Sequence, residues 1–164
     1  MVLDDSNNAR ARPRPAGRKR KPGQGKAGTA APRRPNPAPE LWSKAQEASR
    51  AARLLSDAGD WNGAANRAYY AAFSGARAAL ASVRAALADS KGHGTIIRRF
   101  ERHLIEERSF DSKLGRAFIG NLSHARWVAD YDFADVAEDV ARASVADAER
   151  FLAAVVPFLK KVKS

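Results

Sequence analysis

The sequence of 164 residues contains no cysteine, so disulfides and thiolate metal sites are excluded. No apolar run approaches the roughly 18 residues that a membrane-spanning helix needs. The N-terminus is charged, but no apolar segment follows the charges, which argues against a signal peptide. We therefore expect a cytoplasmic protein that makes no use of a membrane.

Proline is also scarce, except at the N-terminus. Seven of the eight prolines lie in residues 1–39, together with ten Lys or Arg and only two acidic residues, Asp4 and Asp5. Such a segment cannot bury enough apolar surface to offset the entropy of ordering it. We predict a disordered Pro/Arg-rich basic tail over residues 1–39. Without aromatic side chains the tail can contact phosphates but not stack on bases, and a purely solubilising role stays open.

From Glu40 onward the apolar spacing is helical throughout, and no segment reads as a strand. Gly59 is expected to end the first helix, Asp60 to cap the second, Thr95 to cap the third, and Pro157 to kink or fray the last. The predicted helices cover residues 40–58, 60–88, 95 to about 108, 114–128 and 133–160, and Val140 is placed on the inner face of the last one. The sequence thus predicts an all-α fold, an antiparallel bundle of about five helices over residues 40–164.

Two segments carry a recognisable pattern. The first, NRAYYAAFSGARAAL, begins at Asn66, and the second, ARWVADYDF, begins at Ala125. They resemble the HEPN family of nucleotide- and RNA-associated helical domains, whose second helix often reads R-x-Y-Y-A-x-F-x-x-A-R. The resemblance covers about residues 41–158 and implies a homodimer in which the ends of the two fourth helices meet.

Active ribonucleases of this family carry an Arg, four to six further residues and then a His at the end of the fourth helix. The matching arginine here is Arg126, but the His position is occupied by Tyr131, preceded by Ala129 and Asp130, as in an A-D-Y subgroup that this chain resembles. Because an unperturbed tyrosine pKa near 10 makes a poor base, we expect little or no cleavage. Arg126, Asp130 and Tyr131 are the candidate catalytic residues. Arg98 and His103 repeat the Arg-to-His spacing, but in the wrong helix for the family.

Ligand contacts are expected from Arg67, Tyr70, Arg77 and His124 in addition to Arg126. Arg67 and Arg77 lie beside an apolar seam and need a partner, either a carboxylate within the bundle, which we favour, or a ligand phosphate. Of the adjacent Tyr69 and Tyr70, one should lie in the core and the other at its boundary. The fragment Gly92-His93-Gly94 reads best as a plain turn.

These patterns lead to three hypotheses about function. The resemblance implies the HEPN component of a toxin-antitoxin or defence pair, non-catalytic or weakly catalytic, which recognises RNA or a nucleotide and has a nucleotidyltransferase-like partner. The alternatives are a metal-independent endoribonuclease toxin that uses Arg126, and a general nucleic-acid-binding protein that acts through the tail. No metal or cofactor is expected, because no metal-ligand spacing or phosphate-binding loop appears.

Overall fold

The computed structural model describes residues 35–90 and 92–160, and the predicted basic tail lies almost entirely outside this range. The helices are α1 (Ala38–Asp57), α2 (Trp61–Val83), α3 (His93–Phe100), α4 (Arg116–Tyr131) and α5 (Glu138–Lys160). Two 3-10 turns, η1 (Ala85–Leu87) and η3 (Ser112–Leu114), and a π-helical segment, η2 (Glu101–Glu106), lie in the connections. The described residues contain no strand, so the all-α prediction is confirmed.

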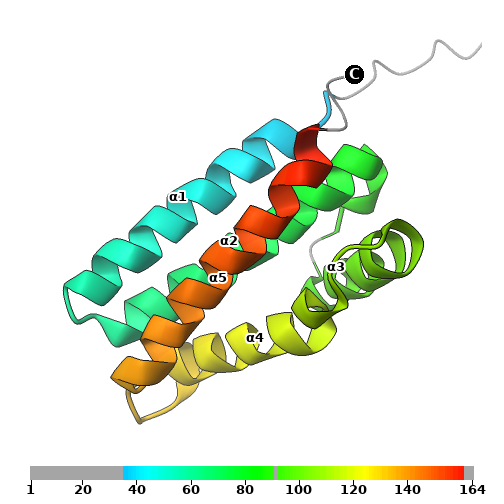
Figure 1. Cartoon of the computed structure of the whole chain (residues 1–164). Helices are drawn as coiled ribbons and strands as arrows, with labels where there is room; N and C mark the ends of the chain where they lie inside the picture. Colours follow the sequence, from blue (N-terminus) through cyan, green and yellow to red (C-terminus); the bar gives the residue numbers. More distant parts are fainter. Residues whose placement is uncertain (1–34, 91, 161–164) are drawn as a thin grey trace, which may run out of the picture. The chain divides into compact units, whose positions relative to one another are not determined.

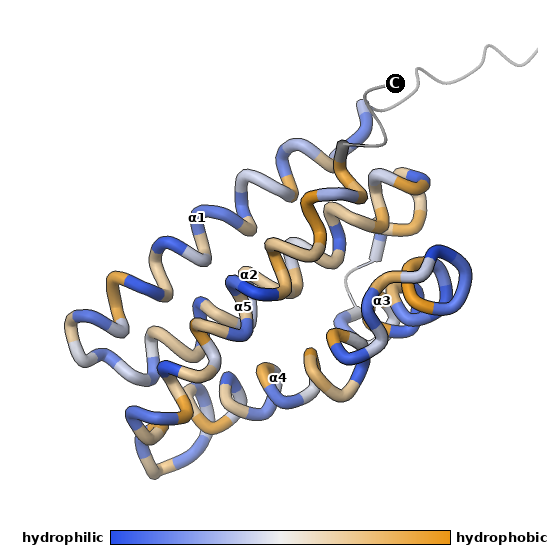
Figure 2. Tube along the Cα trace, in the orientation of Figure 1, coloured by the Kyte–Doolittle hydropathy of each residue, from blue (hydrophilic) through white to orange (hydrophobic). Residues whose placement is uncertain are grey.

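Helix α2 is the centre of the bundle and packs against α1, α3, α4 and α5. In Figure 1, α1 and α2 run antiparallel, and so do α4 and α5. Ten of the buried residues of α2 are alanine or glycine, and such small side chains allow neighbouring helices to approach closely. In Figure 2, hydrophilic and hydrophobic residues alternate along α1 and α5, as expected for helices with one buried face.

Aromatic rings join the α3–η2 region to α5. Phe100 lies 4.9 Å from Phe110 and 5.5 Å from Phe151, and Phe110 lies 5.1 Å from Phe158, measured between ring centroids. Phe100 and Phe151 are fully buried, and burying one such side chain contributes about 1.5–3 kcal/mol. The cluster therefore holds the short α3 against the long helices.

Two predicted helix boundaries are confirmed. Gly59 follows α1 with a φ of +78°, a left-handed conformation that glycine adopts readily. The Oδ1 atom of Asp60 accepts a hydrogen bond of 2.8 Å from the backbone N–H of Gly63 and so caps α2.

Three other boundaries were predicted wrongly. Helix α2 ends at Val83, because Arg84 is extended, and α3 starts at His93, so that Thr95 lies inside the helix. Helix α5 begins at Glu138 instead of residue 133. The chain before it is fixed in a non-helical conformation by Asn62, whose Oδ1 accepts a hydrogen bond of 2.8 Å from the backbone N–H of Val136. The helix then continues through Pro157 to Lys160.

The inner face of α5 also differs from the prediction at one position. Val140 is 44% exposed, because it lies at the edge of a shallow cavity between α4 and α5. Within residues 35–90 and 92–160, none of the helices combines the length and apolarity that a bilayer crossing requires.

Candidate functional site

Arg126 and six neighbouring side chains, seven in all from three helices, form a cluster that we call the Arg126 centre. Helix α2 supplies three of them, α3 supplies one and the last two turns of α4 supply three. The members are Asn66, Tyr69, Tyr70, His93, Arg126, Asp130 and Tyr131. Since α2 packs against both α3 and α4, residues distant in the sequence are neighbours here.

Arg126 is held by charge and by aromatic faces. Its Nη2 atom lies 2.7 Å from Asp130 Oδ2 and 3.5 Å from the hydroxyl of Tyr131. Its Cζ atom lies 5.7–5.8 Å from the ring centres of Tyr69, Tyr70 and Tyr131, within the range of cation–π attraction. Burial lowers the pKa of Arg126, but Tyr70, Asp130 and Tyr131 together raise it above the ordinary value. The guanidinium therefore carries a permanent positive charge.

The guanidinium of Arg126 is not fully satisfied by these contacts. Its Nε atom is buried and has no hydrogen-bond partner among the described residues. The Arg126 side chain as a whole is 21% exposed, so solvent reaches part of it. Arg126 thus keeps N–H donors that no described protein group accepts, and the exposed part of its side chain is where an oxygen-rich ligand can reach it.

Asp130 is bound on both oxygens. While Oδ2 contacts Arg126, Oδ1 accepts a hydrogen bond of 2.6 Å from the side-chain amide of Asn66 on α2. A carboxylate bound in this way positions the arginine and is poorly placed to act as a free base. Asp130 thus fits a positioning role better than the predicted catalytic one.

His93 is the residue that sequence reasoning missed. Its Nδ1 atom lies 2.5 Å from the hydroxyl of the fully buried Tyr69, and its ring stacks on Phe73 with a centroid distance of 4.4 Å. Burial, together with the charges of Arg126 and Arg77, lowers the pKa of His93 below the ordinary value. Burial also raises the pKa of Tyr69, which keeps the phenol protonated. An imidazole supplied by α3 instead of α4 therefore lies against Tyr69, one of the rings that Arg126 contacts.

Tyr69 and Tyr70 divide between core and boundary as predicted, since Tyr69 is inaccessible and Tyr70 is half-buried. The expected carboxylate partner of Arg67 is wrong. Its guanidinium bonds to the side-chain oxygen of Asn66 and lies 5.1 Å from the ring centre of Tyr70. Tyr70 thus has cations from both Arg67 and Arg126 near its ring.

The carboxylate expected for Arg77 is wrong as well. Its guanidinium donates to the backbone carbonyl of Ala88 at 3.1 and 3.3 Å, just after η1. Arg99 donates to the carbonyl of Leu87 at 2.9 Å. Both arginines therefore satisfy carbonyl groups that an interrupted helix leaves open, which explains why they need no carboxylate.

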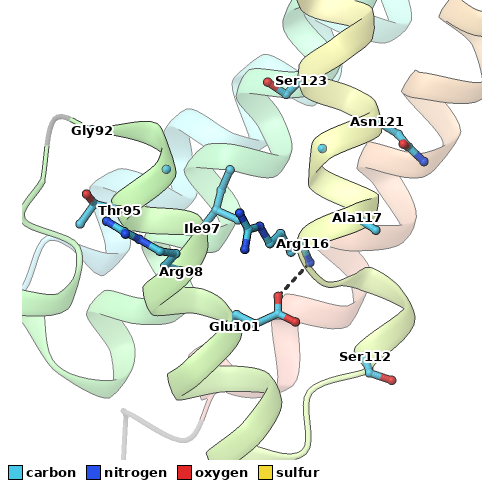
Figure 3. A pocket seen from close by; sticks show the side chains of 12 residues that line it. Gly92, Thr95, Ile97, Arg98, Glu101, Ser112, Arg116, Ala117, Asn121 and Ser123 are labelled. Carbon is cyan, nitrogen blue, oxygen red and sulfur yellow. Dashed lines mark hydrogen bonds between the residues drawn. The ribbon is translucent and has the colours of Figure 1, made fainter.

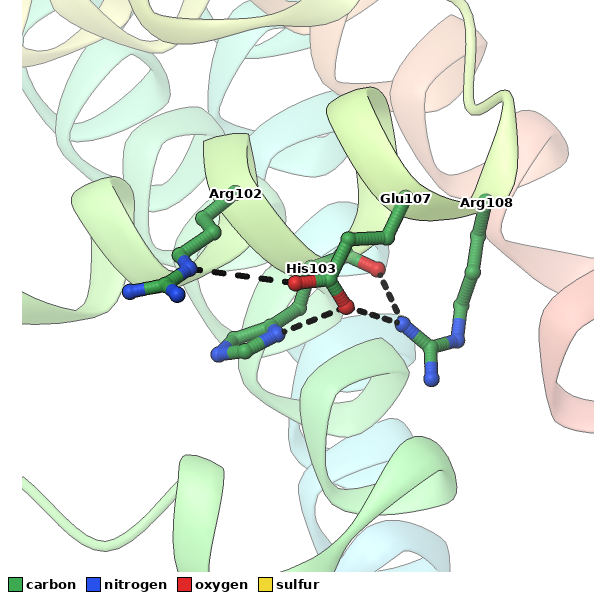
Figure 4. A network of polar contacts seen from close by, with 4 residues as sticks. All are labelled: Arg102, His103, Glu107 and Arg108. Atoms are coloured by element: carbon green, nitrogen blue, oxygen red, sulfur yellow. Dashed lines mark hydrogen bonds and ion pairs between the residues drawn. The ribbon is translucent and has the colours of Figure 1, made fainter.

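The other two histidines lie outside the Arg126 centre. The His124 ring lies parallel to that of Trp127, 6.5 Å away, and its side chain borders the cavity between α4 and α5. His103 contacts Glu107 at 3.0 Å within an exposed network that includes Arg102 and Arg108 (Figure 4). Arg98 is not part of this network, so the Arg98–His103 spacing does not correspond to a paired site.

Comparison with known proteins agrees with this architecture. The model of the HEPN domain family matches residues 38–161. A protein of Methanocaldococcus jannaschii named "Putative toxin MJ0605" is 30% identical over 118 residues, which are 72% of this chain and 85% of that protein. The chain therefore belongs to the HEPN domain family. No group of three or more His, Asp or Glu among the described residues has the geometry to hold a metal ion.

Proposed function

We propose that the protein is a toxin-like HEPN module that binds RNA or a nucleotide through a phosphate at the Arg126 centre and that cleaves RNA slowly or not at all. The observation that carries the proposal is the guanidinium of Arg126, which is fixed by Asp130 and three tyrosine rings while 21% of the side chain stays exposed. Guanidinium groups bind phosphate through paired N–H donors. The Tyr70 ring, half-exposed beside it, offers a surface on which a base can stack.

Poor cleavage is proposed because Tyr131 stands where family nucleases have histidine. Its side chain is 64% exposed, and its hydroxyl is 3.5 Å from Arg126, a weak contact that does little to activate a phenol. Loss of a general base typically costs two to four orders of magnitude in rate.

The test of phosphate binding is Arg126→Gln, with Arg142→Gln as the matched control. Arg142 also pairs with a carboxylate four residues away, Glu138, and also lies over an aromatic ring, that of Trp61. Affinity for a labelled RNA in EDTA should fall at least about ten-fold in Arg126→Gln, the loss of one charge-assisted contact. The control should bind like wild type. Equal affinities for both variants would show that Arg126 is only structural.

The proposal includes a homodimer formed through the end of α4. Trp127 is 52% exposed and Phe133, just beyond the helix, is fully exposed, so a monomer would present both apolar side chains to water. A two-fold axis here would bring two Arg126 centres together, as the family resemblance implies.

The same resemblance supports a role in the cytoplasm beside a nucleotidyltransferase-like antitoxin partner. A reading frame for such an enzyme next to this one is the observation to seek.

A metal-independent endoribonuclease is the second candidate, and His93 favours it. If Nδ1–H donates to Tyr69, the lone pair of Nε2 is free, and the lowered pKa keeps the imidazole unprotonated near neutral pH. Nε2 would take the proton of the ribose 2'-hydroxyl, the 2'-oxygen would attack phosphorus, and the bond to the 5'-oxygen would break as water protonates it. The products are a 2',3'-cyclic phosphate and a 5'-hydroxyl end.

The two candidates differ in the behaviour of His93→Gln. EDTA-resistant cleavage by wild type that disappears in His93→Gln, while RNA affinity is retained, would favour the nuclease. The third hypothesis, binding through the basic tail, depends on residues outside the described range. Deleting residues 1–34 tests it, since each lost phosphate contact should reduce the salt dependence of log affinity by about 0.7–0.9.

A further inference from the structure

A groove of about 1080 Å³ separates α3 from the first half of α4 (Figure 3). Its walls include Gly94, Arg98 and Glu101 on the α3 side and Arg116, Gly120 and Ser123 on the α4 side. We call it the α3–α4 groove. It is far larger than the shallow cavity of about 430 Å³ between α4 and α5.

The charge of the α3–α4 groove is not balanced by the protein. Neither Arg98 nor Arg116 forms a side-chain hydrogen bond or ion pair within residues 35–90 and 92–160. Both line the groove, and Figure 3 shows Arg116 reaching toward α3, whereas Arg98 extends from α3 on the side away from α4. Glu101 is the one carboxylate of the lining, and its Oε2 accepts a hydrogen bond of 2.9 Å from the backbone N–H of Arg116. The guanidinium of Arg116 therefore faces this space and that of Arg98 lies at its rim, both without a partner among the described residues.

Two of the residues that line the α3–α4 groove, Gly94 and Gly120, are glycines next to open space. A Cβ atom added to Gly94 or Gly120 would meet no atom within 4 Å, whereas one added to Gly75 in the core would meet Leu152 at 2.5 Å. Glycine destabilises a helix interior relative to alanine, and Gly120 lies in the interior of α4. Packing explains Gly75 but does not explain Gly120, where the missing side chain leaves room for a ligand.

One end of the α3–α4 groove lies next to the Arg126 centre. Ser123 lies at the end of the groove, and its hydroxyl lies beside that of Tyr69. Gly92 and Gly94, which also line the groove, flank His93. A ligand that occupies both places must carry several negative charges along its length and be narrow enough to lie between two helices.

We propose that the α3–α4 groove binds single-stranded RNA, with Arg98 and Arg116 contacting phosphates of the strand whose next phosphate occupies the Arg126 centre. This inference rests on the proposed function of Arg126. A single strand fits because each nucleotide adds one phosphate, which matches unpaired arginines placed along a path. A mononucleotide reaches only one end of that path.

The first experiment is a charge series at Gly120, where added side chains point into open space. Affinity for a labelled oligouridine should rise several-fold in Gly120→Arg, change little in Gly120→Gln and fall about ten-fold in Gly120→Glu. Affinity for uridine monophosphate should stay the same in all three. Thermal melting checks that each variant is folded. The proposal would be overturned if the affinity for oligouridine did not depend on the sign of the charge at position 120. It would also be overturned if the affinity for uridine monophosphate fell to the same extent, because that result would place a single nucleotide in the groove.

The second experiment removes the arginines. Arg98→Gln with Arg116→Gln should reduce the salt dependence of log affinity for oligouridine by about 0.7 for each lost contact. The control, Lys44→Gln with Arg50→Gln, removes the same charge from exposed positions of α1. If both pairs of substitutions reduced the salt dependence equally, the two groove arginines would contribute only nonspecific charge, and the proposal would be wrong. Arg126→Gln separates the two proposals, because it should weaken uridine monophosphate and oligouridine alike. If Arg126→Gln has no effect while the groove variants do, the proposed function fails and the groove stands alone.

Discussion

Asp130→Asn should separate the stability of the Arg126 centre from its ability to bind phosphate. In the native protein the carboxylate bonds to Arg126 at 2.7 Å and to Asn66 at 2.6 Å, and the side chains of Asp130 and Arg126 are only 23% and 21% exposed. Asparagine keeps the shape and an oxygen for the Asn66 amide. It removes the negative charge that competes with a phosphate for Arg126.

The expected magnitudes follow from these contacts. A hydrogen bond to a charged group contributes about 1.5–3 kcal/mol, and because the pair is partly exposed we expect a loss of about 1–2 kcal/mol in the free energy of unfolding. For a folded region of this size the melting temperature should fall by about 3–10 °C. Removing one negative charge about 5 Å from the phosphate, at nearly the dielectric constant of water, is worth about 1 kcal/mol, or roughly five-fold tighter binding.

The assay pairs thermal unfolding with titration of labelled RNA at two salt concentrations. Asp147→Asn is the control, since Asp147 forms an exposed pair of 3.0 Å with Arg150, and its loss should change stability by less than about 0.5 kcal/mol. If Asp130→Asn weakens RNA binding as well as stability, the carboxylate positions Arg126 for phosphate instead of competing with it. That result would refute the reasoning.

Three further predictions concern pH, packing and assembly. Because the pKa of His93 is lowered in the folded protein, the unfolded chain binds a proton at this residue more readily. The stability that the neutral His93 contributes is therefore fully present above about pH 6.5 and is lost as the pH falls below it. The melting temperature of His93→Gln should accordingly fall less than that of wild type from about pH 7 to about pH 5. Gly120→Ala should raise stability by up to about 1 kcal/mol, whereas Gly75→Ala must displace Leu152 and should lower it by about 1–2 kcal/mol, as chemical denaturation can measure. Trp127→Glu with Phe133→Glu should give a monomer by light scattering, and a wild-type monomer at tens of micromolar would contradict the proposed interface.

The fold was predictable where local chemistry decides it. Asp60 and Gly59 are start and stop signals that act through their own backbone neighbours, and the buried spacing around Tyr69 follows from the helical repeat. Residues 84–88 and 133–137 were assigned to the neighbouring α-helices wrongly, because distant groups fix their conformation. Arg77 and Arg99 bind the carbonyls after α2, and Asn62 binds the backbone before α5. A sequence pattern does not contain those partners.

The candidate site divides in the same way. The motif on α4 pointed to Arg126, Asp130 and Tyr131, which are neighbours on one helix. The absence of histidine from this motif suggested that the site contains no imidazole. His93 is 33 positions before Arg126 and looked like part of a turn. Only the packing of α3 against α2 brings it to Tyr69, and so to the Arg126 centre. When a motif lacks one residue, the residues packed around the remaining ones decide whether its chemistry is lost, and here they include the imidazole of His93, 2.5 Å from the hydroxyl of Tyr69.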